Sequence, residues 1–331
     1  MLRSGLLLLV LERGGALQDL AEGFHADVDE TSISAGFQHT CGIQDIGKDF
    51  GGKLVCWGAN DHGQAAPPDG EFIQVSAGHF HSCGVKIDET VKCWGMAGIG
   101  MSPGGLFLQV SAGSKHTCGI LKDHTLRCWG KNSSGQADPP LGRYVQVSSG
   151  LDHSCALTDK GLAVCWGGNS HKHLNAPQDV QFKQISASFW HHSCGIDIKG
   201  DLRCWGADHA GQAPKVRALA RSRKPARCAR PSITHPPLPR RPRRALLQLV
   251  AGPFEQVSAG GKFTCAIRKG TGAVACWGAD SFGVHGAPDA QFETVTANSQ
   301  HACGLTANAK VECWGNVVHG AEQVPAGFVA A

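Results

Sequence analysis

The sequence predicts an all-β protein, a seven-bladed β-propeller whose blades are short. Three observations predict this fold. The tripeptide Cys-Trp-Gly occurs seven times at nearly constant spacing. Short segments rich in Val, Ile and Phe alternate with turns that contain Gly, Pro, Asp and Asn, which is typical of strands joined in hairpins. No run of ten or more residues has the periodicity of an amphipathic helix.

The tryptophans of these tripeptides define the repeat. Successive tryptophans are 37, 35, 37, 39, 72 and 37 residues apart. The interval of 72 is a normal repeat plus an insertion, because removing residues 215–250 restores the period. The seven positions are Trp57, Trp94, Trp129, Trp166, Trp205, Trp277 and Trp314. We expect these side chains to pack between blades.

Each repeat contains about three short strands. In the second repeat they are Phe72–Gly78, His81–Val85 and Val91–Gly95, and a loop such as Ala59–Gly70 leads from one repeat to the next. A unit of this size cannot bury its own faces, so it has to stack against its neighbours. A closed ring of such units also protects the strand edges from other chains.

In chain order, residues 1–27 form a weakly signal-like or disordered leader, and residues 28–331 form one propeller. The C-terminal segment Val324–Ala331 begins the loop-and-strand pattern of a repeat, and Glu30–Gly36 continues it. We therefore expect N- and C-terminal strands together to close the first blade.

The insertion at residues 215–250 carries eleven Lys or Arg and no Asp or Glu. Its Pro- and Arg-rich composition predicts a disordered segment. It is either a basic arm, a tolerated extrusion or a gene-model artefact. It also contains Cys228, which has no partner in the repeat pattern.

Composition narrows the function. The formal net charge of +4 comes from the insertion, since the rest of the 331 residues carries 20 basic and 27 acidic side chains. An acidic body is a poor binder of phosphate backbones, so no nucleic-acid partner is expected. No apolar run is long enough for a membrane span. Hydrolase, metalloprotease, phosphate-loop and dinucleotide motifs are absent, so we expect no enzyme, no cofactor and no metal.

The cysteines occur in pairs, one pair in each repeat and each flanking a turn. Strands of a hairpin bring such residues opposite one another, close enough for a disulfide. Seven disulfides imply an oxidising compartment, whereas free buried cysteines, the alternative, imply the cytoplasm. The pairs are Cys41/Cys56, Cys83/Cys93, Cys118/Cys128, Cys155/Cys165, Cys194/Cys204, Cys265/Cys276 and Cys303/Cys313.

A histidine stands two residues before the first cysteine in six repeats, and Phe263 takes that position in the other. A His-x-Cys pair on a strand could contribute to a zinc site. We favour instead a buried histidine that hydrogen-bonds a neighbouring loop or blade, because Phe263 cannot bind a metal. The six are His39, His81, His116, His153, His192 and His301.

These motifs resemble the repeats of the regulator of chromosome condensation family, most clearly in Gln74–Gly95 and His116–Gln136. The resemblance covers residues 28–331 outside the insertion and implies the propeller fold. Known members include an exchange factor for a small GTPase, a plant photoreceptor, secreted β-lactamase inhibitors and ectodomains of crinkly-type receptor kinases. The short, cysteine-paired repeat is most similar to the secreted inhibitors and the ectodomains.

The loops that follow Cys-Trp-Gly differ between repeats. Because the repeats are equivalent units of one ring, we expect all of these loops to lie on the same face of it. Variable loops on a rigid scaffold commonly carry binding. We expect a monomeric, secreted or cell-surface module that binds a protein or glycan there. The alternatives are a cytoplasmic regulator of a small GTPase and a secreted enzyme inhibitor. Candidate binding residues are Asn60, Asp61, His62, Asn132, Ser133, Asn169, His171, Asp208, His209, Asp280, Phe282 and Asn316.

Overall fold

The computed structural model describes residues 32–47, 51–98, 102–213, 252–316, 320–321 and 323–331. Within these ranges the secondary structure consists of 21 short strands, three in each of seven blades. Blade 1 contains β1 (Ile33–Ala35), β2 (His39–Gln44) and β3 (Gly52–Gly58), and blade 2 contains β4 (Glu71–Ala77), β5 (His81–Lys86) and β6 (Val91–Gly95). Blade 3 contains β7 (Phe107–Ala112), β8 (His116–Leu121) and β9 (Leu126–Gly130), and blade 4 contains β10 (Tyr144–Ser149), β11 (His153–Thr158) and β12 (Ala163–Gly167). Blade 5 contains β13 (Phe182–Ala187), β14 (His192–Asp197) and β15 (Leu202–Gly206), and blade 6 contains β16 (Phe254–Ala259), β17 (Phe263–Arg268) and β18 (Val274–Gly278). Blade 7 contains β19 (Phe292–Ala297), β20 (His301–Thr306) and β21 (Val311–Gly315).

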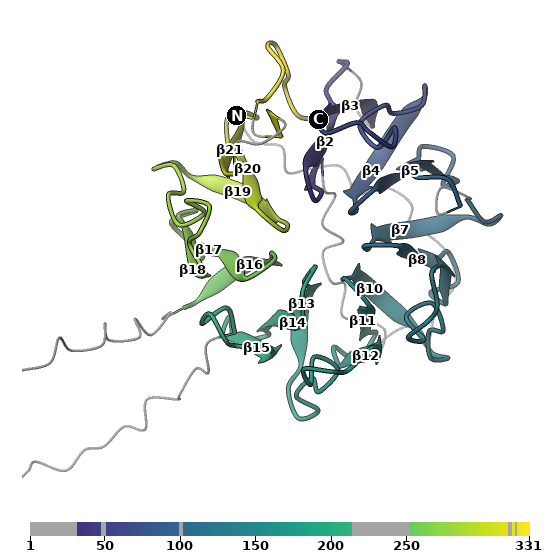
Figure 1. The fold of residues 1–331 in the computed structure, drawn as a ribbon, viewed down its shortest axis with the longest axis vertical. Helices are drawn as coiled ribbons and strands as arrows, with labels where there is room; N and C mark the ends of the chain where they lie inside the picture. The colour runs from purple at the N-terminus through teal and green to yellow at the C-terminus, as the bar shows by residue number, and fades with distance from the viewer. Residues whose placement is uncertain (1–31, 48–50, 99–101, 214–251, 317–319, 322) are drawn as a thin grey trace, which may run out of the picture.

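Each blade is an antiparallel meander whose first strand lies nearest the ring axis (Figure 1). The middle and outer strands align the two cysteines of each repeat directly opposite one another, as in Cys155 opposite Cys165. Every blade is therefore cross-linked between its second and third strands. The seven disulfides have Cα–Cα distances of 4.0–4.1 Å and match the predicted pairs: Cys41–Cys56, Cys83–Cys93, Cys118–Cys128, Cys155–Cys165, Cys194–Cys204, Cys265–Cys276 and Cys303–Cys313.

The two cysteines of a pair differ in burial, which the sequence pattern does not reveal. The first cysteine lies in the middle strand and is fully buried in every blade, as is Cys41. The second lies in the outer strand and is partly exposed in six blades, the exception being Cys93, which is 5% exposed. The six partly exposed cysteines are Cys56, Cys128, Cys165, Cys204, Cys276 and Cys313. All fourteen are therefore structural cross-links, and the outer sulfurs lie nearer to solvent.

A belt of hydrogen bonds joins the inner strands around the axis. The hydroxyl of Ser34 accepts the Ala77 N–H of the next blade at 2.9 Å, and this contact recurs from blade to blade. The seventh contact, from the Ala35 N–H to Thr296 Oγ1, joins blade 7 to blade 1 at 3.0 Å. These seven bonds close the ring seen in Figure 1.

The C-terminal segment completes blade 1, as the sequence predicts. Ala330 bridges Gln44 in the antiparallel sense, so it extends the blade beyond β1. The Phe328 ring lies against Gly42, just as Phe72 lies against Gly84 in blade 2. The two chain ends described by the structure thus supply one blade together, and the C-terminus lies beside β2 in Figure 1.

The core is divided into seven clusters, one at each junction between blades. Between blades 1 and 2, Ile43 meets Phe72 and Trp94. Trp94 donates its indole N–H to the Gln64 carbonyl of the connecting loop at 2.9 Å. Five other tryptophans make the equivalent bond, and Trp129 does not. All seven pack in or against a cluster between blades, as predicted.

The six repeat histidines also join blades. His81 Nε2 is hydrogen-bonded to Thr117 Oγ1 of the next blade at 2.7 Å, and the other five make the same contact with Ser or Thr. Where Phe263 replaces histidine, the facing residue of blade 7 is Ala302 instead of Ser or Thr. No hydroxyl is left without its partner at that junction.

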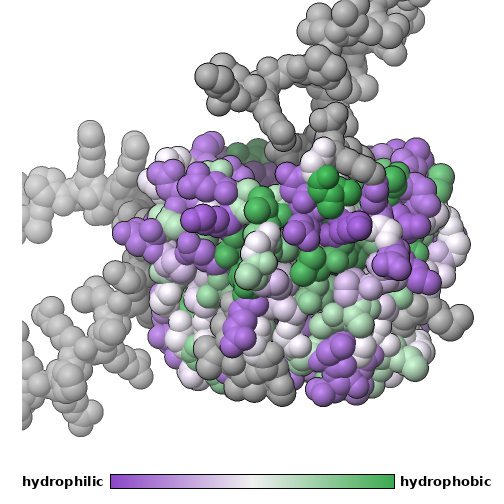
Figure 2. Space-filling view, turned by 90° about the horizontal axis from the view of Figure 1, so that it is seen from above, coloured by the Kyte–Doolittle hydropathy of each residue, from purple (hydrophilic) through white to green (hydrophobic). Residues whose placement is uncertain are grey.

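The leader, the insertion at residues 215–250 and Cys228 lie outside the described residues. In the part that the structure describes, no helix is long and apolar enough to cross a membrane. The rim of the ring near blades 1 and 7 shows small hydrophobic areas separated by hydrophilic residues (Figure 2).

Candidate functional site

Two sets of loops share one face of the ring. One set consists of the short turns between inner and middle strands, and the other consists of the loops after Cys-Trp-Gly. They touch in blade 2, where the His62 and Phe80 rings lie 5.0 Å apart, and the Ala59 N–H donates to the Gln38 carbonyl in blade 1. We call this surface the loop face.

The predicted binding residues lie on the loop face, and all except Asn316 are exposed. In five of the loops, however, the second residue after Cys-Trp-Gly folds back on its own backbone. Asn60 Oδ1 accepts the Ala65 N–H at 3.0 Å, and Asn132, Asn169, Asp208 and Asp280 make the same bond. These side chains shape the loops, which leaves residues such as Asp61, His62, Ser133, His209 and Phe282 to face solvent.

A glutamine fixes the other end of three of these loops. Gln64 Oε1 accepts the His62 N–H at 2.8 Å, and Gln136 and Gln212 repeat the contact. The residue before each of these glutamines is a glycine with positive φ, for example Gly63 at 79°. Such backbone strongly favours glycine.

The loop of blade 4 departs from this pattern at both positions. Lys172 takes the glycine position with φ of 62°, and His173 takes the glutamine position. A lysine in left-handed backbone costs roughly 1–2 kcal/mol. The His173 side chain is fully buried, but neither ring nitrogen makes a hydrogen bond of standard geometry, although the Gly168 backbone lies close enough to raise its pKa. The stability of the fold therefore does not explain why lysine stands at the glycine position or why histidine stands at the glutamine position of this loop.

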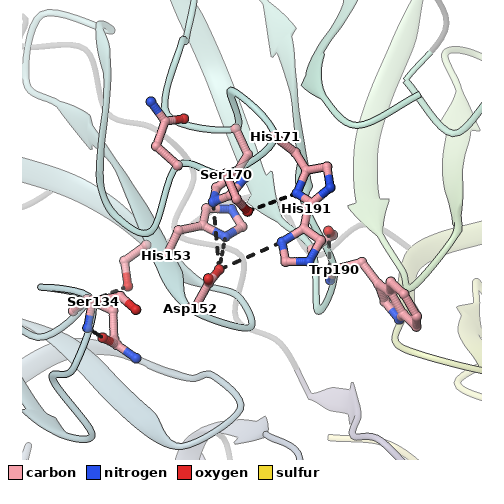
Figure 3. Close-up of polar contacts among 12 residues, drawn as sticks. Ser134, Asp152, His153, Ser170, His171, Trp190 and His191 are labelled. Atoms are coloured by element: carbon pink, nitrogen blue, oxygen red, sulfur yellow. Dashed lines mark hydrogen bonds and ion pairs between the residues drawn. The ribbon is translucent and has the colours of Figure 1, made fainter. Parts of the chain in front are cut away.

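His173 belongs to a cluster centred on Asp152, and Figure 3 shows Asp152 with His153 and His191 around it. The Asp152 Oδ1 atom lies 3.9 Å from His153 Nδ1, 3.7 Å from His173 Nε2 and 3.9 Å from His191 Nδ1. All three distances exceed those of hydrogen bonds. Asp152 and His191 lie in the turns before β11 and β14, so the cluster spans the junction of blades 4 and 5.

These imidazoles are held in the neutral form by their surroundings. Burial lowers the pKa of His153 well below 6.5, and the neighbouring His173 lowers it further. Burial also lowers the pKa of His173 and of His191, although Asp152 opposes that shift in both. A neutral imidazole keeps a nitrogen lone pair that can bind a proton or a metal ion.

A separate aromatic group occupies the loop face near blades 1, 2 and 5. The His79 ring stacks on Phe80 at 3.9 Å between ring centroids and lies 3.8 Å from Phe37. It also approaches the Phe189 ring of blade 5 at 6.5 Å. His79 and Phe80 follow β4 in blade 2, and Phe189 follows β13 in blade 5. Because these blades are not neighbours, the group reaches across the middle of the ring.

The turn of blade 5, which carries Phe189 of this group, also presents an exposed aromatic residue, Trp190. It has four residues, 188–191, whereas the equivalent turns of the other blades have three. The Trp190 side chain is 39% exposed, and Lys262 Nζ lies 4.6 Å from the centre of its ring. The extra residue brings a large aromatic ring to the surface.

The zinc alternative considered for the His-x-Cys pairs does not fit. Both cysteines of every pair are oxidised in disulfides, and the histidine Nε2 atoms contact hydroxyls. The residues that do gather, Asp152, His173 and His191, were missed by sequence reasoning. The available signal was the variable residue before each repeat histidine, which is Asp152 in blade 4 and His191 in blade 5.

Comparison with known proteins identifies the repeat. The sequence matches the regulator of chromosome condensation (RCC1) repeat over six segments, which together cover just over half of the chain. The matched residues are 31–64, 72–97, 107–136, 144–172, 182–212 and 254–284.

Solved structures support the same fold. The crinkly ectodomain of the Arabidopsis thaliana receptor kinase ACR4 is 23% identical with a TM-score of 0.63, over 86% of this chain and 97% of that one. The ectodomain of the Physcomitrella patens receptor kinase CR4 is 21% identical with a TM-score of 0.65, over 86% and 73%. Prp20p of Saccharomyces cerevisiae, described with its binding to Gsp1p and histones, is 15% identical with a TM-score of 0.62, over 87% and 86%.

Proposed function

Because this chain belongs to the regulator of chromosome condensation (RCC1) repeat family, we propose that it is a non-catalytic, extracellular recognition module that binds a protein through its loop face. Known propellers with this fold include ectodomains of receptor kinases as well as Prp20p, which is described with its binding to Gsp1p and histones. The cysteine pairing favours the extracellular setting, since seven disulfides persist in an oxidising compartment.

The observation that carries the proposal is the exposed Trp190, which follows Phe189 of the aromatic group in the same turn of the loop face. Tryptophan is enriched among the residues that dominate protein–protein binding energy. Its turn is held at both ends, because the Ser188 hydroxyl accepts the Trp190 and His192 N–H groups at 3.0 and 3.2 Å. A partner therefore meets a preorganised ring, which lowers the entropic cost of binding.

The test begins with the full chain secreted from eukaryotic cells. The secreted chain is artificially tetramerised and screened against a panel of secreted proteins and receptor ectodomains. The affinity of the monomeric chain for each partner found is then measured by interferometry. We expect Trp190→Ala to weaken binding at least about tenfold, as for other interface tryptophans. Ile198→Ala is the matched control, because Ile198 is 52% exposed in a turn at the opposite end of its blade and should leave affinity unchanged.

Two results would contradict the proposal. One is a partner whose binding depends on Ile198 and not on Trp190. The other is retention of the chain inside the cell together with faster nucleotide release from a small GTPase. Binding to a glycan array with the same dependence on Trp190 would keep the loop face but replace the protein partner.

A further inference from the structure

We propose that Asp152, His153, His173 and His191 form a binding site for a divalent transition-metal ion of the zinc type. The four atoms that would bind it are the Asp152 Oδ1, the His153 Nδ1, the His173 Nε2 and the His191 Nδ1. This inference is independent of the protein-binding proposal.

The first argument is the spacing of the donor atoms. The three nitrogens lie 3.7–3.9 Å from one carboxylate oxygen, and the donors of Asp152, His153 and His173 all lie within 4.8 Å of one another. A tetrahedral zinc ion with bonds of 2.0–2.1 Å separates its ligand atoms by about 3.3 Å. The distances to the carboxylate are therefore about half an ångström longer than in a filled site and too long for hydrogen bonds, and donor atoms up to 4.8 Å apart would have to draw together when the ion binds.

The second argument is that these donors lack other partners. Asp152 Oδ1, His173 Nε2 and His191 Nδ1 are buried atoms without a hydrogen bond. His153 Nδ1 is also unpaired, but so are the equivalent atoms of His39 and His81. The unpaired state of His153 Nδ1 is therefore weaker support for a metal site than that of the other three atoms. Leaving several buried polar atoms unsatisfied costs about 1–3 kcal/mol each, which a bound ion would offset.

The third argument concerns protonation and orientation. His153 Nε2 lies 2.9 Å from Ser193 Oγ. In blades 2 and 6 the equivalent hydroxyls, Ser82 and Thr264, donate to a loop carbonyl and so accept from histidine. We assign His153 the same tautomer by analogy with those blades, which places its proton on Nε2 and leaves a lone pair on Nδ1, as in metal-bound histidines oriented by a second partner.

The other blades supply an internal comparison. The positions equivalent to the four proposed ligands can be read at the other junctions. At the junction of blades 1 and 2 they hold Gln38, His39, Gln64 and Phe80, and at the junction of blades 5 and 6 they hold His191, His192, Gln212 and Lys262. Among the described junctions, only that of blades 4 and 5 has a potential ligand at every position. His171 stacks on His191 at 4.3 Å between nearly parallel rings, and donor atoms of His171, His173 and His191 also lie within 4.8 Å of one another, so His171 borders the site.

Ligand chemistry selects the metal. Three imidazoles and one carboxylate suit Zn²⁺ and related transition ions, whereas Ca²⁺ and Mg²⁺ prefer oxygen ligands. Asp152 and His191 have side chains 27% and 22% exposed, so an ion can enter from the loop face. Once bound, it would tie the turns of blades 4 and 5 to the loop that carries His173.

The experiment titrates zinc into the untagged full chain after treatment with a chelator, using calorimetry and metal analysis after dialysis. Every sample carries Cys228→Ser, because a thiol can bind zinc by itself. We expect one zinc per chain and a higher melting temperature in its presence. Cobalt in place of zinc should give the visible absorption of a tetrahedral site.

His173→Gln is the decisive variant, because glutamine occupies this position in the loops of blades 1, 3 and 5 and should fold. We expect at least about tenfold weaker zinc binding in His173→Gln and in Asp152→Asn. His62→Gln, on the same face but outside the cluster, should bind like the parent. The proposal is overturned if the parent binds no stoichiometric zinc, or if folded His173→Gln binds zinc as tightly as the parent.

Discussion

At the scale of single residues, blade junctions depend on matched pairs, and one junction uses a different pair. Phe263 faces Ala302 where six other junctions pair histidine with Ser or Thr. We predict that Phe263→His alone destabilises the chain by about 2–4 kcal/mol, because it buries an imidazole without a partner. Adding Ala302→Ser should recover about 1 kcal/mol. Denaturant unfolding of the four members of this cycle measures the coupling, and strictly additive effects would refute it.

The buried histidines also predict a pH dependence. Burial, the largest cause, lowers the pKa of His116 and His192 to about 3 and of His301 to about 4. These groups bind protons more readily when unfolded, so their stabilisation is complete above about pH 6.5 and is lost as the pH falls through their folded pKa values of about 3 to 4. Each should cost about 1–2 kcal/mol between pH 7 and 5.

Melting curves between pH 7 and 5 test this dependence. The melting temperature should fall over that range, and His116→Gln should give a shallower slope because it removes one titrating group. Equal melting temperatures at pH 7 and pH 5 would show that these histidines do not titrate on unfolding.

At the scale of the element, each blade is stabilised by its own disulfide and by its two neighbours. In a repeat array of this kind, losses remain largely local. We predict that replacing Cys118 and Cys128 by alanine costs about 2–3 kcal/mol, since the bond closes a loop of 10 residues. Hydrogen exchange should accelerate in β8 and β9 and stay unchanged in β20 and β21. Equal acceleration in all blades would contradict a local role.

The strands and disulfides could be predicted because the repeat fixes them seven times. A cysteine pair ten residues apart, with a turn between, has one simple arrangement in a hairpin, and the repetition removes ambiguity. The zinc-type cluster could not be predicted in this way. Asp152 and His191 are 39 residues apart in sequence and come together only because equivalent turns of adjacent blades are neighbours.

The binding residues illustrate the same limit. Asn60 and Asp208 were selected by their place in variable loops, but their side chains cap the loops through backbone N–H groups five residues ahead. Spacing alone does not tell a capping side chain from an exposed one. Trp190 became notable only when the structure placed it at the surface of a lengthened turn.

At the scale of the whole molecule, stability depends on closing the ring. Blade 1 is completed by two distant parts of the chain, with the belt bond from Ala35 to Thr296 on one side and the C-terminal segment on the other. The Phe328 ring fills the space above Gly42 and lies 5.5 Å from the Trp57 ring. No residue in the rest of the described chain can take its place, because each other blade uses its own inner-strand aromatic.

We therefore predict that Phe328→Ala lowers the free energy of unfolding by about 3–5 kcal/mol, the range for a buried phenylalanine. Deleting Val324–Ala331 should cost more, because it also removes the bridge between Gln44 and Ala330. Unlike the loss of a single disulfide, this change should accelerate hydrogen exchange in both β2 and β20, since it opens the junction that holds blades 7 and 1 together. Phe282→Ala is the control, because that side chain is 42% exposed on the loop face and closes nothing. If Phe328→Ala unfolds at the same denaturant concentration as Phe282→Ala, the C-terminal segment does not close the ring in solution, and the seven belt bonds must hold the propeller together without it.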